Sequence, residues 1–208
     1  VEKREDGTLI LRSPIKLETP EKNIWSKFNQ TCEEFPDTIW LGEREGNYWR
    51  KITYSEAKKL VYSISQFLLN KNLGQNRGLM ILSGNSVNHG LISVAGLCSG
   101  VPIAPISVAY SLMSSDFAKL KHCFDLVEPG LIYVEDGLIF ETALKNLPLE
   151  SVTLICSKNP VDISGKKMIL FDDIISTISK SNIEDIFNKV KPDYTAKYLF
   201  TSGSTGMP

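Results

Sequence analysis

The chain has 208 residues, of which 42% are hydrophobic and 23% are charged, and its formal net charge is −1. This composition is typical of a globular protein long enough to bury a core. A charge balance so close to zero gives no sign of a nucleic-acid or anionic-membrane partner. No apolar run approaches the roughly 20 residues that span a bilayer. The sequence therefore argues against both nucleic-acid binding and membrane insertion.

Cysteine usage and the N-terminus predict a cytoplasmic protein. The four cysteines, Cys32, Cys98, Cys123 and Cys156, are far apart and form no C-x-x-C pair. We therefore expect reduced, mostly buried thiols. The charged start of the chain is not followed by the apolar stretch of a signal peptide.

The first 53 residues are predicted to form an arm, a short helix and a β-hairpin. Residues 1–22 are polar, with one short strand expected at 9–11. A helix over 23–35 should stop before the following proline, which cannot continue it. Strand-like runs at 38–42 and 48–53 flank a turn-rich stretch, and this spacing is typical of a hairpin with its turn at 43–47.

The clearest amphipathic helix follows the hairpin. Thr53 and Glu56 form a capping box, in which each side chain satisfies a free N–H group at the helix start. Apolar residues then recur at helical spacing, at positions 57, 60, 61, 64, 67 and 68. We expect the helix to end at 72–74, where Gly74 supplies a C-terminal cap.

Strand-like and helix-like segments alternate along the rest of the chain. The expected strands are 79–82, 101–106, 131–134, 152–156, 168–171 and a last one at 196–200. The expected helices are 86–99, 114–127, 140–146, an ambiguous one at 172–179, and one opened by a second capping box at 181–184 and running to 190. Residues 157–167 are expected to form a loop. The small glycines Gly90 and Gly96 should let the helix over 86–99 pack closely on a sheet.

Strands that alternate with helices predict right-handed crossovers and a mainly parallel sheet with helices on both faces. The fold class is therefore α/β, with a small N-terminal β-hairpin. Pro102 and Pro105 cannot donate to a ladder, so the strand at 101–106 should lie at a sheet edge or be only partly paired. Ligands of such sheets bind at the C-terminal ends of strands, and the last predicted strand ends at the loop described next.

The final loop is the most informative segment of the sequence. It consists of hydroxyls and glycines, namely Thr201, Ser202, Gly203, Ser204, Thr205 and Gly206. Glycines let backbone N–H groups turn toward one point, and Ser and Thr hydroxyls add further donors. Such a convergence of donors suits a polyphosphate. A Walker-type loop is excluded, because G-x-x-x-x-G-K-[ST] cannot be written across these residues.

This stretch closely resembles the signature of the AMP-forming acyl-adenylate enzymes, which include acyl-CoA synthetases, coumarate–CoA ligases, luciferases and peptide-synthetase adenylation domains. Their pattern is an apolar pair, then T-S-G-S/T-T-G, a variable residue, proline and lysine. Met207 and Pro208 fill the variable and proline places, and the lysine would be residue 209. The feruloyl-CoA synthetase branch is resembled further by the segments 7–14, 80–86, 100–105, 109–114 and 120–122.

The resemblance implies a role for each residue of the loop and a reaction for the parent protein. In that family the loop closes over the β- and γ-phosphates of ATP, a role that falls here on Thr201, Ser202, Gly203, Ser204, Thr205 and Gly206. The implied reaction uses ATP, Mg²⁺ and CoA, and converts a small-molecule carboxylate such as ferulate to acyl-AMP and then to a CoA thioester. The resemblance places no catalytic residue and no metal ligand in this chain, and it leaves the oligomeric state open.

The resemblance also implies an incomplete N-terminal domain of an AMP-binding ligase, without the C-terminal domain. Residues 1–22 would form its arm, 23–195 an α/β subdomain, and 196–208 a strand and the phosphate-binding loop. Such a fragment should be inactive by itself. Two alternatives stay open: a non-catalytic binding or scaffold domain, if the chain naturally ends here, and an adenylating enzyme that does not use CoA.

Other polar residues have simpler structural interpretations. His89 and His122 are expected at the surface or at the edge of the core rather than as general bases. Asn85 and Ser86 follow a strand, where ligands bind, but helix capping accounts for both. The acidic pair at 172–173 is interpreted as a solvated turn rather than a metal site.

Overall fold

The computed structural model describes residues 1–180, 182–201 and 206–208. Its centre is a five-stranded sheet, in which all neighbouring strands are parallel and the order is β11-β8-β7-β5-β6. These strands are β5 (Leu79–Leu82), β6 (Ile103–Pro105), β7 (Leu131–Asp136), β8 (Thr153–Lys158) and β11 (Ile169–Leu170). The predicted α/β class, with a mainly parallel sheet, is confirmed. The predicted edge position of the proline-flanked strand β6 within this sheet is confirmed as well.

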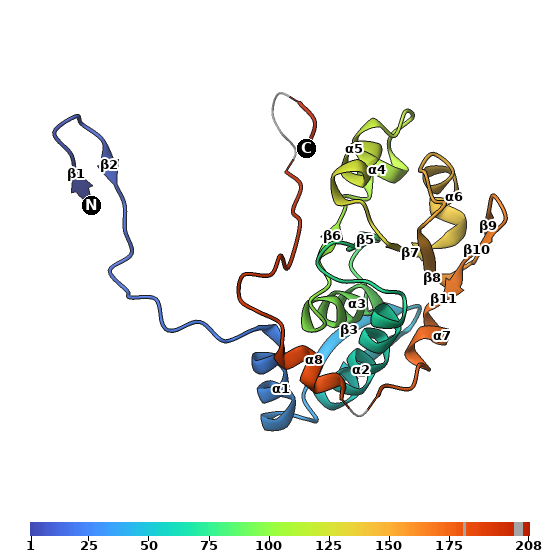
Figure 1. The fold of residues 1–208 in the computed structure, drawn as a ribbon, viewed down its shortest axis with the longest axis horizontal. Helices are drawn as coiled ribbons and strands as arrows, with labels where there is room; N and C mark the ends of the chain where they lie inside the picture. Colours follow the sequence, from blue (N-terminus) through green and yellow to red (C-terminus); the bar gives the residue numbers. More distant parts are fainter. Residues whose placement is uncertain (181, 202–205) are drawn as a thin grey trace.

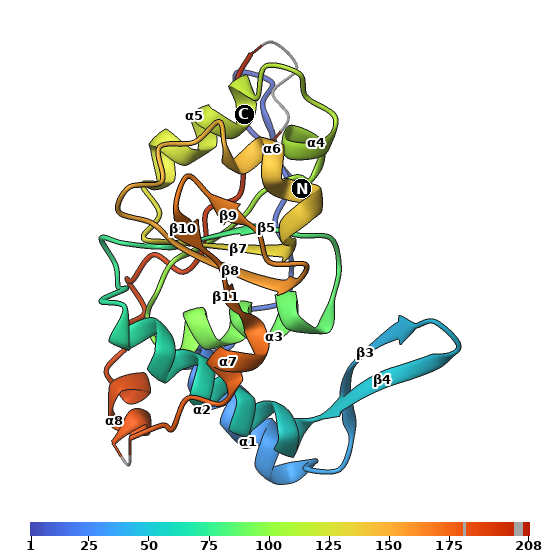
Figure 2. The same ribbon diagram turned by 90° about the vertical axis from the view of Figure 1, so that its right-hand side faces the viewer.

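Helices cover both faces of the sheet (Figures 1 and 2). One face carries α1 (Ile24–Glu34), α2 (Tyr54–Asn70), α3 (Val87–Cys98), α7 (Phe171–Ile175) and α8 (Ile183–Asn188), and the other carries α4 (Ala109–Leu112), α5 (Ala118–Val127) and α6 (Gly137–Leu144). Alternate residues of β5 serve the two cores: Leu79 and Ile81 pack with α2 and α3, whereas Met80 and Leu82 pack with α5 and α6. All four side chains are fully buried, and burial of each contributes about 1.5–3 kcal/mol.

Helix α2 begins as predicted and ends at Asn70, a little before the expected end at 72–74. Thr53 and Glu56 form the predicted capping box. The left-handed residue after the helix is Asn72, with φ of 57°, and not Gly74. The N–H of Asn72 donates to the carbonyl of Leu69, and that of Leu73 to the carbonyl of Leu68. This is the Schellman arrangement, and asparagine tolerates the left-handed conformation that it needs.

The hairpin of β3 (Ile39–Glu45) and β4 (Tyr48–Thr53) has a tighter turn than predicted. Glu43, Arg44 and Glu45 were expected in the turn but pair with β4 as strand residues. The turn is formed by Gly46 and Asn47 alone, and Gly46 has φ of 58°. The hairpin projects from the body beside α3 (Figure 2).

Two glycines give α3 close neighbours on different sides. A Cβ on Gly96 would lie 2.7 Å from Cγ2 of Ile103, so this glycine packs on the sheet as predicted. A Cβ on Gly90 would lie 2.5 Å from Cδ1 of Leu41 in the hairpin. The prediction that Gly90 serves the sheet is therefore wrong: its missing side chain makes room for β3.

Several boundaries differ from the sequence predictions. Helix α4 was not predicted, and α5 starts later than expected from Ser114. The hydroxyl of Ser114 and the carboxylate of Asp116 accept hydrogen bonds from the N–H groups of Phe117 and Ala118, which delays the helix. The expected loop at 157–167 contains a small antiparallel pair, β9 (Asp162–Ile163) and β10 (Lys166–Lys167). Helix α8 follows Asn182, which makes no side-chain capping bond, and Ser181 of the predicted second capping box lies outside the described residues.

The segment 196–200 runs beside β6 but does not form the predicted strand. Ile103 N–H donates to the Ala196 carbonyl at 3.1 Å, and Tyr198 N–H donates to the Ile103 carbonyl at 2.9 Å. These two bonds make one isolated parallel bridge between Ile103 and Lys197. Alternate residues of an edge strand turn their backbone N–H and C=O groups to the same neighbour. After Ile103, the next residue of β6 that faces the segment 196–200 is therefore Pro105. Proline has no N–H to donate, and the ladder ends there.

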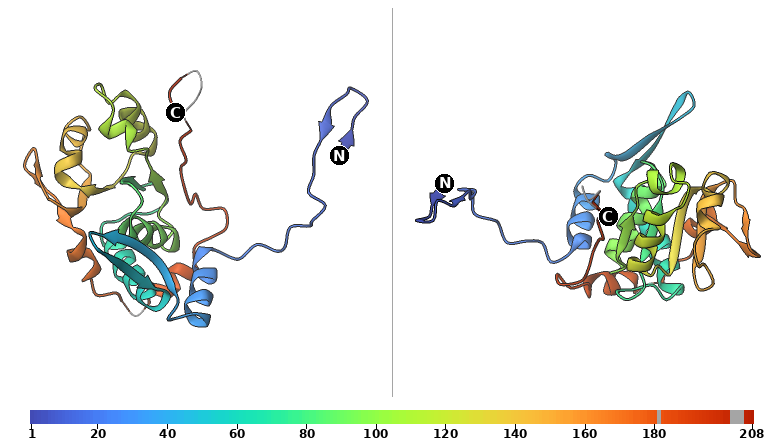
Figure 3. Two further views of the ribbon diagram at one scale, coloured as in Figure 1. Left: turned by 180° about the vertical axis from the view of Figure 1, so that it is seen from behind. Right: turned by 90° about the horizontal axis from the view of Figure 1, so that it is seen from above.

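The N-terminal arm leaves the body of the molecule (Figures 1 and 3). Its two short strands, β1 (Glu2–Lys3) and β2 (Leu9–Ile10), pair with each other. The four cysteines are all free and buried, as predicted. Among the helices of the described residues, none combines the length and the apolar character needed to cross a membrane.

Candidate functional site

The topology of the sheet defines one position where ligands of α/β proteins commonly bind. From β5 the chain passes through α3 to β6, and it then returns through α4 and α5 on the opposite face to β7, on the other side of β5. The order in which successive strands are added to the sheet therefore reverses between β5 and β7. A crevice outside the carboxyl ends of such strands is the usual ligand site of an open α/β sheet.

Here the chain's own carboxylates occupy this position. Glu135, at the end of β7, accepts a hydrogen bond from Gly84 N–H at 3.2 Å. Glu43, from the hairpin, accepts one from Val87 N–H at 2.6 Å, at the first residue of α3. The turn between β5 and α3 thus already directs its free N–H groups at anions. A ligand phosphate would have to displace these two carboxylates.

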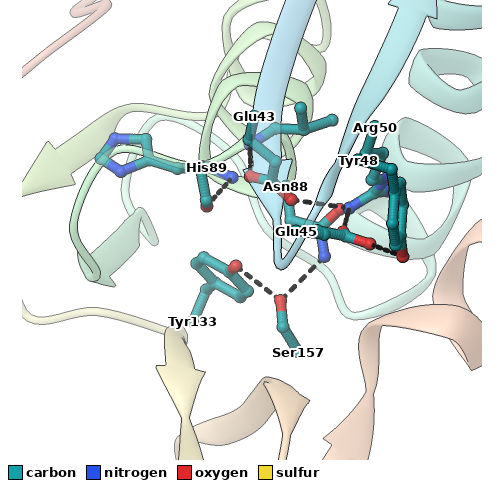
Figure 4. Close-up of polar contacts among 10 residues, drawn as sticks. Glu43, Glu45, Tyr48, Arg50, Asn88, His89, Tyr133 and Ser157 are labelled. Carbon is teal, nitrogen blue, oxygen red and sulfur yellow. Dashed lines mark hydrogen bonds and ion pairs between the residues drawn. The ribbon is translucent and has the colours of Figure 1, made fainter.

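A polar network ties the hairpin to the sheet at the same place (Figure 4). Arg50 forms an ion pair with Glu43 at 3.2 Å and donates to Oδ1 of Asn88 at 3.0 Å. Nδ2 of Asn88 donates to Oγ of Ser157 at 2.8 Å, and the Tyr133 hydroxyl lies 2.7 Å from the same Oγ. Burial raises the pKa of Tyr133 to about 12, so its hydroxyl stays protonated at neutral pH. The network joins β4, α3, β7 and β8.

Beside this network lies a polar cleft of about 740 Å³. Its lining includes acidic and basic side chains in similar number: Glu43, Arg44, Glu45, Arg50, Glu135, Lys158 and Asp172. Asn85 and Ser86 also line it, and Ser86 is the N-cap of α3, as predicted, accepting from His89 N–H. Because acidic and basic side chains are mixed here, the cleft offers no concentrated positive charge for a triphosphate.

His89 lies at the edge of the core, as predicted. Its Nδ1 is 3.0 Å from Oγ of Ser83 and 3.0 Å from the Gly84 carbonyl. Burial lowers the pKa of His89, against a smaller opposing effect of the Gly84 carbonyl. The imidazole is therefore neutral at physiological pH and holds the turn after β5.

The predicted phosphate loop falls only partly within the described residues. Ser202, Gly203, Ser204 and Thr205 lie outside them, and their predicted roles stay predictions. Thr201 and Gly206, on either side, are exposed. A Cβ on Gly206 would meet nothing within 4 Å, so this chain by itself places no steric demand for glycine there.

Both flanks of the loop contact the body of the molecule. Phe200 packs against the core cluster under α5 and α6. Nε2 of His122, on α5, lies 3.1 Å from the Pro208 carbonyl. The loop therefore starts and ends beside the same layer of helices, at the edge formed by β6.

A protein-built metal site is not visible in the described part of the chain, where no three His, Cys, Asp or Glu side chains converge. Asp172 and Asp173 lie exposed in the first turn of α7 rather than in a free turn.

A parallel sheet with helices on both faces, and a polar cleft beside the ends of its strands, defines the α/β class of protein. The chain belongs to the family of AMP-binding enzymes, whose sequence profile matches residues 28–208. The match runs through the whole hydroxyl and glycine loop.

Individual proteins resemble this chain in sequence or in fold. A long-chain-fatty-acid–CoA ligase of Bos taurus is 25% identical over 99% of this chain, which spans 28% of that ligase. The NpsA N-terminal subdomain of Klebsiella oxytoca, solved with 3-hydroxyanthranilyl-AMSN, superposes with a TM-score of 0.60 at 20% identity, covering 90% of this chain and 40% of that one. The O-succinylbenzoate coenzyme A synthetase MenE of Bacillus subtilis, solved with AMP, gives 0.59 at 15% identity, covering 90% and 41%.

Sequence reasoning missed several residues that shape the site. Glu43 was assigned to a turn, and Arg50 and Asn88 were not singled out. The alternation of polar residues along β3 and β4 is a weak indication that one face of the hairpin makes polar contacts. It does not identify the partners, because these lie on other elements. The same holds for Gln75, which contacts the segment leading to the phosphate loop.

Proposed function

We propose that the protein carrying this chain is an ATP-dependent carboxylate–CoA ligase, and that residues 201–206 bind the β- and γ-phosphates of ATP. The observation that carries the proposal is the family match through residues 28–208, which ends in Thr-Ser-Gly-Ser-Thr-Gly. The carboxylates of Glu135 and Glu43 support it, because they already accept from the N–H groups of Gly84 and Val87 in the turn after β5 and leave the phosphates to another part of the fold.

The proposed reaction has two steps. A carboxylate oxygen of the substrate attacks the α-phosphorus of ATP, and the bond to the bridging oxygen breaks, which gives acyl-AMP and pyrophosphate. The sulfur of CoA then attacks the acyl carbon, the bond to AMP breaks, and the thiol proton is lost to solvent or base. The products are a thioester and AMP.

The loop supplies donors where negative charge grows. As pyrophosphate leaves, charge develops on its oxygens, and preorganised N–H and O–H groups stabilise that charge without having to reorient. Mg²⁺, when bound to the phosphates, supplies further positive charge. Thr201, Ser202, Ser204 and Thr205 offer hydroxyls for this role, and Gly203 and Gly206 allow close approach of the backbone.

The substrate we propose is a small aromatic acid such as ferulate. The resemblance of residues 80–86 and 100–105 to feruloyl-CoA synthetases supports this choice, and the NpsA neighbour binds an aromatic acyl-adenylate analogue. The fatty-acid ligase relative supports a long-chain acid instead. We propose a cytoplasmic location, in keeping with four free and buried cysteines.

The test is ATP–pyrophosphate exchange by the protein that carries this chain (the longer protein below), with ferulate and palmitate compared as the carboxylate substrate. We expect exchange with ferulate, and thioester formation when CoA is added. Thr205→Ala should lower kcat/KM for ATP by about tenfold or more, as expected for one charge-assisted hydrogen bond. Thr142→Ala, at an exposed position of α6, is the matched control and should leave it unchanged.

Each other outcome points to a different function. Exchange with palmitate alone would replace the aromatic substrate. Acyl-AMP without thioester would indicate an adenylating enzyme that does not use CoA. Failure to exchange with any carboxylate would favour a binding or scaffold role.

A further inference from the structure

A rigid turn beside the sheet presents Gln75 to the segment that leads into the phosphate loop. The turn joins α2 to β5, and the backbone groups of Gly74 and Arg77 bond each other at 3.2 and 3.0 Å. The Arg77 guanidinium donates to the carbonyls of Lys71, at 3.0 Å, and Ser151, at 2.7 Å. These bonds fasten the turn to the end of α2 and to the segment before β8.

The Gln75 side chain bonds both backbone groups of one distant residue. Thr195 N–H donates to Oε1 of Gln75 at 2.8 Å, and Nε2 donates back to the Thr195 carbonyl at 3.1 Å. Nε2 also donates to the Gly100 carbonyl at 2.8 Å, just before β6. One side-chain amide therefore connects Thr195 to the beginning of the edge strand.

Near β6, few described backbone N–H groups can bond the segment that leads into the phosphate loop, and the side chain of Gln75 supplies an attachment instead. The Val101 N–H donates to the Gly96 carbonyl, at the end of α3. Pro102 and Pro105 have no N–H to offer. Within the described ranges, the stretch from Val101 to Pro105 therefore holds the loop-bearing segment by backbone bonds at Ile103 alone. Gln75 adds a second attachment upstream of that bridge.

We propose that Gln75 is a positioning residue for the phosphate loop, an inference that rests on the proposed function. Five residues lie between Thr195 and Thr201, and one of them is Lys197, which forms the bridge with Ile103. Two attachment points define both the position and the direction of an extended segment, whereas one point lets it pivot. Gln75 thereby directs the entry of the loop, while Phe200, just before the loop, packs against the core cluster under α5 and α6.

A purely structural role for Gln75 makes a different prediction. It would lower the stability of the fold but leave nucleotide use by the folded enzyme unchanged. A positioning role moves the KM for ATP, with a smaller effect on kcat, because the misplaced loop first weakens binding of the phosphates. The two roles are therefore separable by measurement.

The first experiment is hydrogen exchange on the present chain, with Gln75→Leu, Gln75→Glu and a control. Gln75→Glu keeps an acceptor for Thr195 N–H but removes both donors and sets a charge against two carbonyls. Gln66→Leu is the control, because Gln66 also holds a distant backbone group, the N–H of Lys180 at 3.0 Å. We expect exchange at Thr195 and Tyr198 to accelerate about tenfold in Gln75→Leu and to stay unchanged in Gln66→Leu.

The second experiment measures ATP–pyrophosphate exchange by the longer protein with the same variants. Gln75→Leu should raise the KM for ATP about three- to tenfold, and Gln66→Leu should leave it unchanged. Unchanged exchange at Thr195, or an unchanged KM in folded Gln75→Leu, would overturn the positioning role. A wild-type protein without ATP–pyrophosphate exchange activity would overturn the proposed function. An active wild type together with an unaffected Gln75→Leu variant would overturn the role of Gln75 alone.

Discussion

Glu43 on the hairpin accepts a hydrogen bond from Val87 at the N-terminus of α3, with 2.6 Å between Oε2 and the backbone nitrogen. The other oxygen of Glu43 pairs with Arg50 at 3.2 Å. An anion at this helix end is stabilised by the helix dipole and by a free N–H group. A side chain of the protein therefore fills the position that a phosphate could take.

Glu43→Gln should lower the free energy of unfolding by about 1–2 kcal/mol, because it removes the charge that both Arg50 and the helix end stabilise. Urea denaturation measures this loss. Glu45→Gln is the control: Glu45 lies 3.9 Å from Arg50 and is more exposed, so it should lose less than about 1 kcal/mol. Equal losses in the two variants would mean that the contact with α3 contributes little.

Asn88→Ala should separate the hairpin from the sheet. Asn88 is buried and bonds Arg50 on one side and Ser157 on the other. Its loss leaves both partners without this bond, at a cost of about 1–3 kcal/mol. We expect a lower melting temperature and faster amide exchange in β3 and β4. Asn85→Ala, at an exposed position of the same cleft, should behave like wild type.

The buried His89 predicts a pH dependence of stability. Burial lowers its pKa in the folded state below the unfolded value of about 6.5. The unfolded chain therefore binds more protons between these two pKa values, and the contribution of His89 to stability falls as pH drops from about 6.5. The slope from this one group is at most about 1.4 kcal/mol per pH unit.

His89→Gln should flatten the fall in unfolding free energy between pH 7 and pH 5, measured by denaturation at each pH. Ser83→Ala keeps the imidazole buried and should retain the slope. A His89→Gln variant with the wild-type slope would show that other groups dominate acid sensitivity in this range.

Gly96 and Gly206 should differ in how strongly an alanine substitution destabilises the fold. A Cβ at Gly96 would approach Ile103 to 2.7 Å and the Val101 carbonyl to 3.2 Å. Overpacking then outweighs the gain in helix propensity, and Gly96→Ala should lose about 1–2 kcal/mol. Gly206→Ala meets nothing within 4 Å and should change the unfolding free energy by less than about 0.5 kcal/mol.

Gly206→Ala should nevertheless impair ATP use by the longer protein, if the backbone there approaches a phosphate. The matched measurements are urea denaturation of this chain and ATP–pyrophosphate exchange. Wild-type kinetics in Gly206→Ala would remove this glycine from the proposed site.

Local patterns predicted most elements because their causes are local. The capping box at Thr53 and Glu56, the helical spacing of apolar residues in α2, and the buried run Leu79–Leu82 each act within a few residues of sequence. Boundaries failed where a neighbour intervened. Ser114 and Asp116 delay α5, and Asn72 rather than Gly74 closes α2, because hydrogen-bond partners decided which candidate residue was used.

The order of the strands and the filling of the crevice could not be predicted from spacing. Glu43 and Val87 are far apart in sequence, and so are Gln75 and Thr195, yet each pair is joined by a hydrogen bond. Such contacts depend on how the hairpin and the turn before β5 pack, which short-range periodicity does not encode.

The amino-acid sequence alone determined the α/β class and the hydroxyl and glycine loop, because alternating apolar runs and side-chain chemistry are properties of the chain itself. Only the tertiary structure decided that the carboxylates of Glu43 and Glu135 accept from the N–H groups of the turn after β5, and that Gln75 holds the approach to the loop. The physical reason is that a hydrogen bond requires two groups to meet within about 3 Å. For residues distant in sequence, the packing of the whole sheet brings about that meeting.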